Sequence, residues 1–181
     1  MDEVIENGYT RLIEIIRTQK KAIDGMGDEI AQKNADLFER MIAMTVPLIS
    51  DVGIQMLQIG KVDTKGEVYD ARHYDEKMIL LGKSEEVVPV RPDDFSKQVT
   101  DQFCMLGESG TVYELMYSRD ELIVDSYLAE LSFRDAITLY GYDILFMLYK
   151  AMRQYCTGQE ELVEALEKTV TFINGSPKPV K

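Results

Sequence analysis

Two blocks of sequence with helical periodicity enclose a central block with the periodicity of β-strands. Residues 2–46 and 132–173 repeat apolar side chains every three or four positions, whereas residues 52–128 form short alternating runs bounded by turn residues. Strands that are joined by short turns pair antiparallel, and helices then pack against the sheet. The sequence therefore predicts a single α+β domain over residues 1–175, followed by a disordered tail at 176–181.

The first 47 residues are predicted to form a helical hairpin. The segment Asp24-Gly25-Met26-Gly27 is expected to break the helical pattern, because glycine is a poor helix former. Asp28 suits the N-cap of the second helix, and Pro47 ends that helix because proline lacks a backbone donor. The apolar stripe of the first helix contains Ile5, Tyr9, Leu12, Ile16 and Ile23, and that of the second contains Ile30, Leu37, Met41 and Met44.

The central block, residues 51–128, predicts an antiparallel sheet of about five strands with one inserted helix. Pro92 suits the first position of a helix, and the aspartates that follow it suit a positive helix end, so a short helix is expected from 93 to 105. Turn residues separate the remaining runs into strands. A three-stranded meander is predicted at 52–62, 68–73 and 77–82, and a hairpin at 111–117 and 121–128.

The C-terminal block, residues 131–174, predicts two helices, so that the whole order becomes α-α-β-β-β-α-β-β-α-α. Ser132 and Asp135 form a variant capping box at the start of the first helix. The segment around Gly158 is expected to separate this helix from a final one at 159–173. The first helix is apolar on more than one side, which indicates burial on more than one side. One side is expected to form a partner interface through Tyr140, Ile144, Met147, Leu148, Met152 and Tyr155.

Charge and cysteine content narrow the classes of partner. The chain carries a net charge of −12. Its negative electrostatic field repels phosphate backbones and anionic lipid surfaces. We therefore expect no nucleic-acid partner and no membrane partner, whereas a basic protein partner is allowed. Two cysteines exclude a disulfide scaffold, and the acidic N-terminus is unlike a signal peptide, so a cytoplasmic protein is expected.

No motif in the sequence indicates a reaction, a metal or a cofactor. His73 is the single histidine, and Cys104 and Cys156 are too far apart in sequence to form a zinc-binding pair. A general-base or pH-switch role for His73 needs partner groups such as a nucleophile and an orienting acid, and no local spacing in the sequence indicates them. We therefore expect no catalytic residues, no metal ligands and no cofactor.

Two functional interpretations remain. The first is a non-enzymatic protein-binding accessory or regulatory protein, either adaptor-like or chaperone-like, that forms a homodimer or joins a larger complex. The predicted order α-βββ-α-ββ-α in the middle of the chain resembles that of type III secretion chaperones, and this resemblance in element order implies a small acidic dimer that holds partner segments. The alternative is a small-molecule sensor or enzyme. Its site would use Arg72, His73, Tyr74, Asp75 and Arg91.

Overall fold

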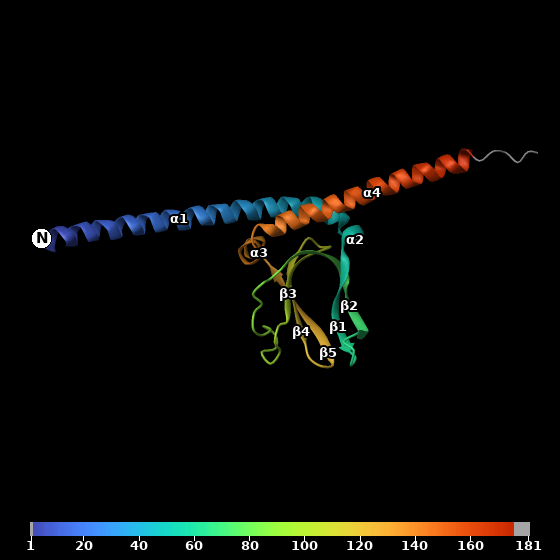
Figure 1. Ribbon diagram of the computed structural model, residues 1–181, viewed down its shortest axis with the longest axis horizontal. Helices are drawn as coiled ribbons and strands as arrows, with labels where there is room; N and C mark the ends of the chain where they lie inside the picture. Colours follow the sequence, from blue (N-terminus) through green and yellow to red (C-terminus); the bar gives the residue numbers. More distant parts are fainter. Residues whose placement is uncertain (1, 176–181) are drawn as a thin grey trace, which may run out of the picture.

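A closed barrel of five strands lies beneath two long helices (Figure 1). The computed structural model describes residues 2–175. The predicted fold class, α+β with a five-stranded antiparallel sheet, is confirmed, and the sheet closes into a barrel. The helices are α1 (Asp2–Thr45), the 3-10 turn η1 (Val46–Leu48), α2 (Ile49–Val52), α3 (Phe133–Tyr140) and α4 (Asp143–Gly175). The strands are β1 (Ile54–Val62), β2 (Val68–Lys83), β3 (Asp101–Gly107), β4 (Val112–Arg119) and β5 (Ile123–Leu131).

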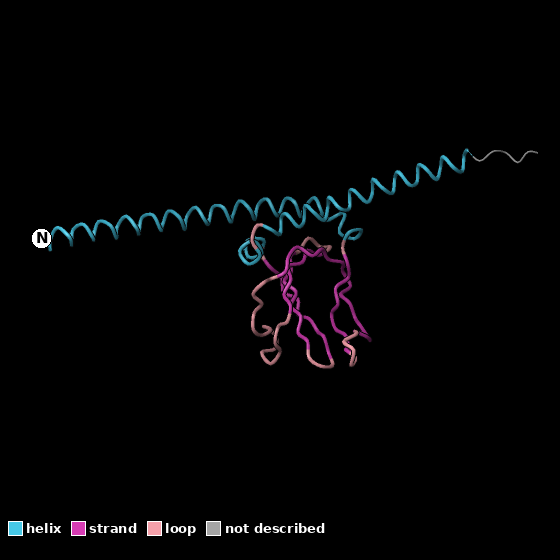
Figure 2. Tube along the Cα trace, in the orientation of Figure 1, coloured by secondary structure: helices cyan, strands magenta, loops and turns pink. Residues whose placement is uncertain are grey.

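The barrel is a meander in which each strand pairs with its neighbour and β1 pairs with β5 to close it (Figure 2). The sixteen-residue strand β2 pairs with β1 along its first part and with β3 from Met78 onward. The two separate strands predicted at 68–73 and 77–82 are therefore one strand. The three residues between them include no glycine or proline, and register shifts opposite β1 let the strand bend without breaking.

Side chains of the central strands alternate between two apolar layers. Met78, Met105 and Leu115 are fully buried in a cluster that contains no helical residue, and this cluster fills the barrel interior. The side chains at intervening positions, such as Leu81 and Leu106, pack outward against the helices. Burial of both faces explains why β2 and β3 are nearly continuous apolar runs at these positions. The helical side of the outer layer includes Phe38, Ile42, Ile49, Ile137, Ile144, Leu145 and Leu148.

The predicted helical hairpin at 1–47 is wrong, because α1 runs without a break from Asp2 to Thr45. Asp28, the expected N-cap, lies inside this helix. A side chain at Gly25 or Gly27 would meet no other part of the chain within 4 Å, so the helix meets no obstacle there, although each glycine weakens the helix by about 1 kcal/mol. Glycine lowers the stability of a helix but does not force it to end. The prediction that the helix stops before Pro47 is confirmed.

The helix predicted at 93–105 is also absent. Residues 84–100 form a loop, and β3 begins at Asp101. Gln102 and Cys104 face the helices while Phe103 and Met105 face the barrel interior, so the alternation of β3 was masked by apolar residues on both faces. One of the elements on which the resemblance to type III secretion chaperones rested is therefore a loop and a strand.

The break between the C-terminal helices lies at Gly141 rather than near Gly158. Gly141 has a φ of 74° and a ψ of −174°, a conformation that is essentially confined to glycine. Gly158 lies inside α4, where a side chain would meet no other part of the chain within 4 Å. The predicted capping box is confirmed, since the Ser132 hydroxyl accepts a hydrogen bond from the Asp135 amide. The predicted disordered tail, 176–181, lies outside the described residues.

Candidate interaction surface

The five residues of the alternative small-molecule site are divided between two environments. Arg72, His73 and Asp75 are exposed on β2, and no side-chain hydrogen bond or ion pair joins the His73 imidazole to another residue within 2–175. Tyr74 points into the barrel, where its hydroxyl lies 2.9 Å from Ser126 Oγ. Burial raises the pKa of the Tyr74 phenol, so this hydroxyl stays neutral at physiological pH.

Arg91 is buried and ties the 84–100 loop to β5. Its guanidinium donates to Asp93 at 2.9 and 2.5 Å and to Asp125 at 2.8 Å, and it stacks over the Tyr127 ring at 5.9 Å. Lys97 also donates to Asp125. The hydrogen bond from Arg91 lowers the pKa of Asp93, so the pair stays charged at neutral pH. Two carboxylates and two cations neutralise one another here, and this balance indicates a role in holding the loop.

The six predicted interface residues also separate into core and surface. Ile144 and Leu148 are at most 1% exposed and pack in the core of this chain. Tyr140 donates to Glu114 Oε1 at 3.2 Å, next to the Gln102 amide that donates to the same oxygen at 2.5 Å. The remaining three residues lie nearer the surface. Met147 lines a hollow beside the end of β2, and Met152 and Tyr155 line a groove on the other side of α4.

This groove runs between the end of α1 and the first half of α4, and we call it the interhelical groove. Its volume is about 680 Å³, and its walls are almost entirely apolar. Met44 is 71% exposed and Tyr149 is 54% exposed, so the apolar surface is open to solvent. Continuous exposed apolar surface of this kind is typical of a binding site for another chain. The lining residues are Met41, Met44, Thr45, Leu48, Leu148, Tyr149, Met152, Tyr155, Cys156 and Gln159.

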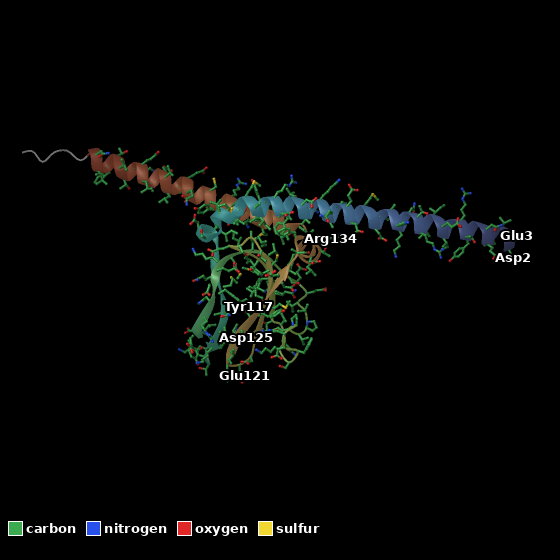
Figure 3. All side chains as sticks on the ribbon, turned by 180° about the vertical axis from the view of Figure 1, so that it is seen from behind. Asp2, Glu3, Tyr117, Glu121, Asp125 and Arg134 are labelled. Carbon is green, nitrogen blue, oxygen red and sulfur yellow. The ribbon has the colours of Figure 1, made fainter. Side chains whose placement is uncertain are left out.

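A second apolar surface lies on residues 2–30 of α1, which we call the α1 arm. Figure 3 shows its side chains standing clear of the barrel from Asp2 and Glu3 onward. Every residue of the arm is exposed except Ile13, which is half-buried. One exposed ion pair, from Arg134 to Asp28 at 2.8 Å, joins the arm to α3. The arm therefore has no core of its own.

The apolar side chains of the α1 arm form one stripe with a strict seven-residue repeat. Ile16, Ile23 and Ile30 are seven residues apart and occupy the a positions of a heptad, with Tyr9 one repeat earlier. The d positions hold Ile5, Leu12, Gln19 and Met26. These eight residues are called the arm seam. The two stripes predicted for a helical hairpin therefore both contribute residues to one seam, and the seven-residue interval from Ile23 to Ile30 is the sequence signal that the helix continues.

The second half of α4 projects from the barrel in the opposite direction (Figure 1). Its apolar side chains are half exposed or more, and all except Phe172, which lies beside Glu164 and Lys168, continue from the interhelical groove along one broad stripe. Four glutamates and one lysine lie between Gln159 and Gly175, so this surface is acidic. The exposed apolar residues are Leu162, Val163, Leu166, Val170, Phe172 and Ile173.

Comparisons with known proteins give no family and no relative for this chain. No family model, no curated protein and no solved structure matches it. Among the helices of residues 2–175, none combines the length and apolar character that crossing a bilayer requires. The same residues contain no group of three or more His, Cys, Asp or Glu side chains placed to hold a metal ion. The geometry of the helical surfaces therefore carries the functional argument.

Proposed function

We propose that this chain is a non-enzymatic protein-binding accessory or regulatory protein that holds an amphipathic helix of a partner in the interhelical groove. The observation that carries the proposal is the open, almost wholly apolar lining between α1 and α4. Two helices side by side form a trough into which a third helix can lay its apolar face. Three lining residues are methionines, whose flexible side chains adapt to different apolar partners.

The charge around the groove supports a partner helix with a basic polar face. Asp51 accepts a hydrogen bond from Tyr155 at 3.3 Å beside the groove, and Glu160 and Glu161 follow directly along α4. The whole chain has a net charge of −12. Lysines and arginines on the outer face of a docked helix would lie beside these carboxylates, which speeds association and disfavours acidic competitors.

A charge placed in the groove tests the proposal. Met44→Glu puts a carboxylate on the apolar surface at a side chain that is already 71% exposed, so the fold is expected to tolerate it. The binding partner is captured with the wild-type protein from an extract of the source organism and identified by mass spectrometry. Its affinity for each purified variant is then measured by calorimetry. We expect Met44→Glu to weaken binding at least about tenfold, because binding would bury the new charge.

Phe95→Glu is the matched control, because Phe95 is an exposed aromatic residue of the 84–100 loop, far from the groove in sequence and 77% exposed. It introduces the same charge on another part of the surface and should leave the affinity within about twofold. Equal affinities for wild type and Met44→Glu, with both proteins folded by circular dichroism, would exclude the groove as the binding site.

A further inference from the structure

We infer that the α1 arm pairs with the α1 arm of a second copy of this chain, parallel and in register, as a two-stranded coiled coil from Ile5 to Ile30. This inference concerns residues outside the interhelical groove and goes beyond the proposed function. The α1 arm is exposed to solvent along almost its whole length. An isolated helix is marginal in water, and most helices in proteins are stabilised by packing of an apolar face. The α1 arm has such a face, contains Gly8, Gly25 and Gly27, and packs on nothing within 2–175 except through the Asp28 ion pair.

The residue types in the arm seam favour two parallel strands. Isoleucine occupies three successive a positions, at 16, 23 and 30, and Leu12 occupies a d position. A β-branched residue at a with leucine at d is the pattern that favours parallel dimers, because each side chain then enters the hole of the facing helix in an unstrained rotamer. Between 49% and 64% of each apolar side chain in the seam is exposed, so a second helix can cover every one of them.

Gln19 decides between a parallel and an antiparallel pair. It is the single polar residue of the seam and occupies a d position. In a parallel pair in register, d faces d, so the Gln19 amide meets the Gln19 amide of the second copy and the two can hydrogen-bond. Every antiparallel register places d against a, and the a residues of the arm seam are all aliphatic or aromatic. A buried amide without a hydrogen-bond partner is unfavourable. The parallel register is therefore favoured, because it gives each Gln19 amide a partner.

The residues that flank the arm seam place no like charges against each other in this register. In a parallel pair each g position faces the e position five residues on in the second helix. Ile15 then faces Lys20, whose methylene stem it can cover, and Glu29 faces Asn34. The other charged side chains between 11 and 28 lie at b, c and f, on the outer surface of the pair. They are Arg11, Glu14, Arg17, Lys21, Asp24 and Asp28.

The length of the arm seam matches what a stable pair needs. Covering seven apolar side chains on each of two helices removes on the order of 1,000 Å² of apolar surface from water, and the polar flanks bring the total to about the size of specific interfaces, ~1,200–2,000 Å². The seam ends where α1 meets the rest of the molecule. The next d residue is Lys33, ion-paired to Glu29 at 2.6 Å, and from Ala35 and Phe38 onward α1 packs on the other helices and the barrel.

Cysteine cross-linking of the full-length protein tests both the pairing and its direction. In a Cys156→Ser background, which removes the exposed native thiol, Leu12→Cys places one thiol in the seam at a d position. Parallel register brings the two cysteines into disulfide range, about 4.4–6.8 Å between Cα atoms. We expect mild oxidation to link most chains in pairs. Glu14→Cys, on the outer f position, is the matched control and should link few.

Mass in solution supplies the second measurement. Sedimentation equilibrium should give twice the chain mass of 20.7 kDa for the wild type. Ile16→Asp with Ile23→Asp should weaken the dimer at least about a hundredfold, because each charge would be buried in the seam. A wild-type monomer at micromolar concentration overturns the inference. A dimer in which Leu12→Cys links no better than Glu14→Cys overturns the parallel register.

These outcomes can be separated from the fate of the proposed function. The Ile16→Asp and Ile23→Asp substitutions leave the interhelical groove intact, and Met44→Glu leaves the arm seam intact. Loss of the dimer with retained partner affinity identifies the arm seam as the interface between copies. Loss of partner affinity by Met44→Glu with a retained dimer identifies the groove as the partner site.

Discussion

The buried polar residues Gln102 and Glu114 of the barrel have specific partners, which accounts for their presence in an apolar environment, whereas the buried Ser118 Oγ has no hydrogen-bond partner among the described residues. Glu114 is 9% exposed and accepts hydrogen bonds from Gln102 and Tyr140, while the side-chain oxygen Oε1 of Gln102 accepts from the Val88 backbone amide. Such bonds offset the cost of removing polar groups from water. The network therefore joins β3, β4, the 84–100 loop and α3 at one point of the outer layer.

The two cysteines are expected to differ sharply in reactivity. Cys104 is fully buried, and burial, reinforced by the Glu114 carboxyl, raises the pKa of its thiol to about 12. The thiolate is the reactive form, so Cys104 should not react at pH 8, whereas Cys156 is exposed on α4. Titration with a thiol reagent should find one group in the native protein and two in denaturant. Cys156→Ser should remove the native signal, and rapid native labelling of Cys104 would contradict this burial.

At the scale of elements, glycine has opposite consequences in different backbone conformations. Gly25, Gly27 and Gly158 lie within helices, where glycine is a weakness but not a termination signal. Gly141 has a positive φ between α3 and α4, where any side chain would be strained. The sequence alone does not distinguish these cases, because local composition is similar and the packing of α3 and α4 on the barrel determines where the chain must turn.

Alanine substitutions at two glycines test where α3 and α4 divide. Gly158→Ala should stabilise α4 by up to about 1 kcal/mol, since alanine favours helix and nothing lies within 4 Å of the new Cβ. Gly141→Ala should lower the free energy of unfolding by about 1–3 kcal/mol because of its backbone conformation. Urea denaturation of both variants measures the two effects. If both substitutions changed the free energy of unfolding in the same direction, the placement of the break at Gly141 would be contradicted.

The whole molecule combines a barrel with two long helices, α1 and α4, which extend beyond it in opposite directions (Figure 1). The outer face of the barrel, the last turns of α1 and the first turns of α4 share one hydrophobic cluster. The 29-residue α1 arm spans about 43 Å and takes no part in this core. Stability and association are therefore expected to depend on different residues, with stability in the barrel and its helical cover and association on the arm and groove.

Deletion of residues 2–24 tests this separation. The deleted residues are exposed apart from Ile13, so the barrel should unfold with a free energy within about 0.5 kcal/mol of that of the full chain when both are monomeric. Ile49→Ala is the contrasting variant, because Ile49 is fully buried and its truncation should cost about 2–5 kcal/mol. Chemical denaturation at low protein concentration measures both. A loss of several kcal/mol on deletion would show that the arm contributes to the core.

The sequence by itself determined the fold class, the capping box at Ser132, the helix end before Pro47 and the hairpin of β4 and β5, because periodicity, caps and tight turns are local signals. Closure of the barrel, the joining of two predicted strands into β2 and the strand at β3 depended on pairing between distant segments. Tertiary packing also decided that Ile144 and Leu148 are core while Met44 and Tyr149 are surface. An apolar stripe has the same spacing in both cases, and only the position of the barrel determines which side of a helix is covered.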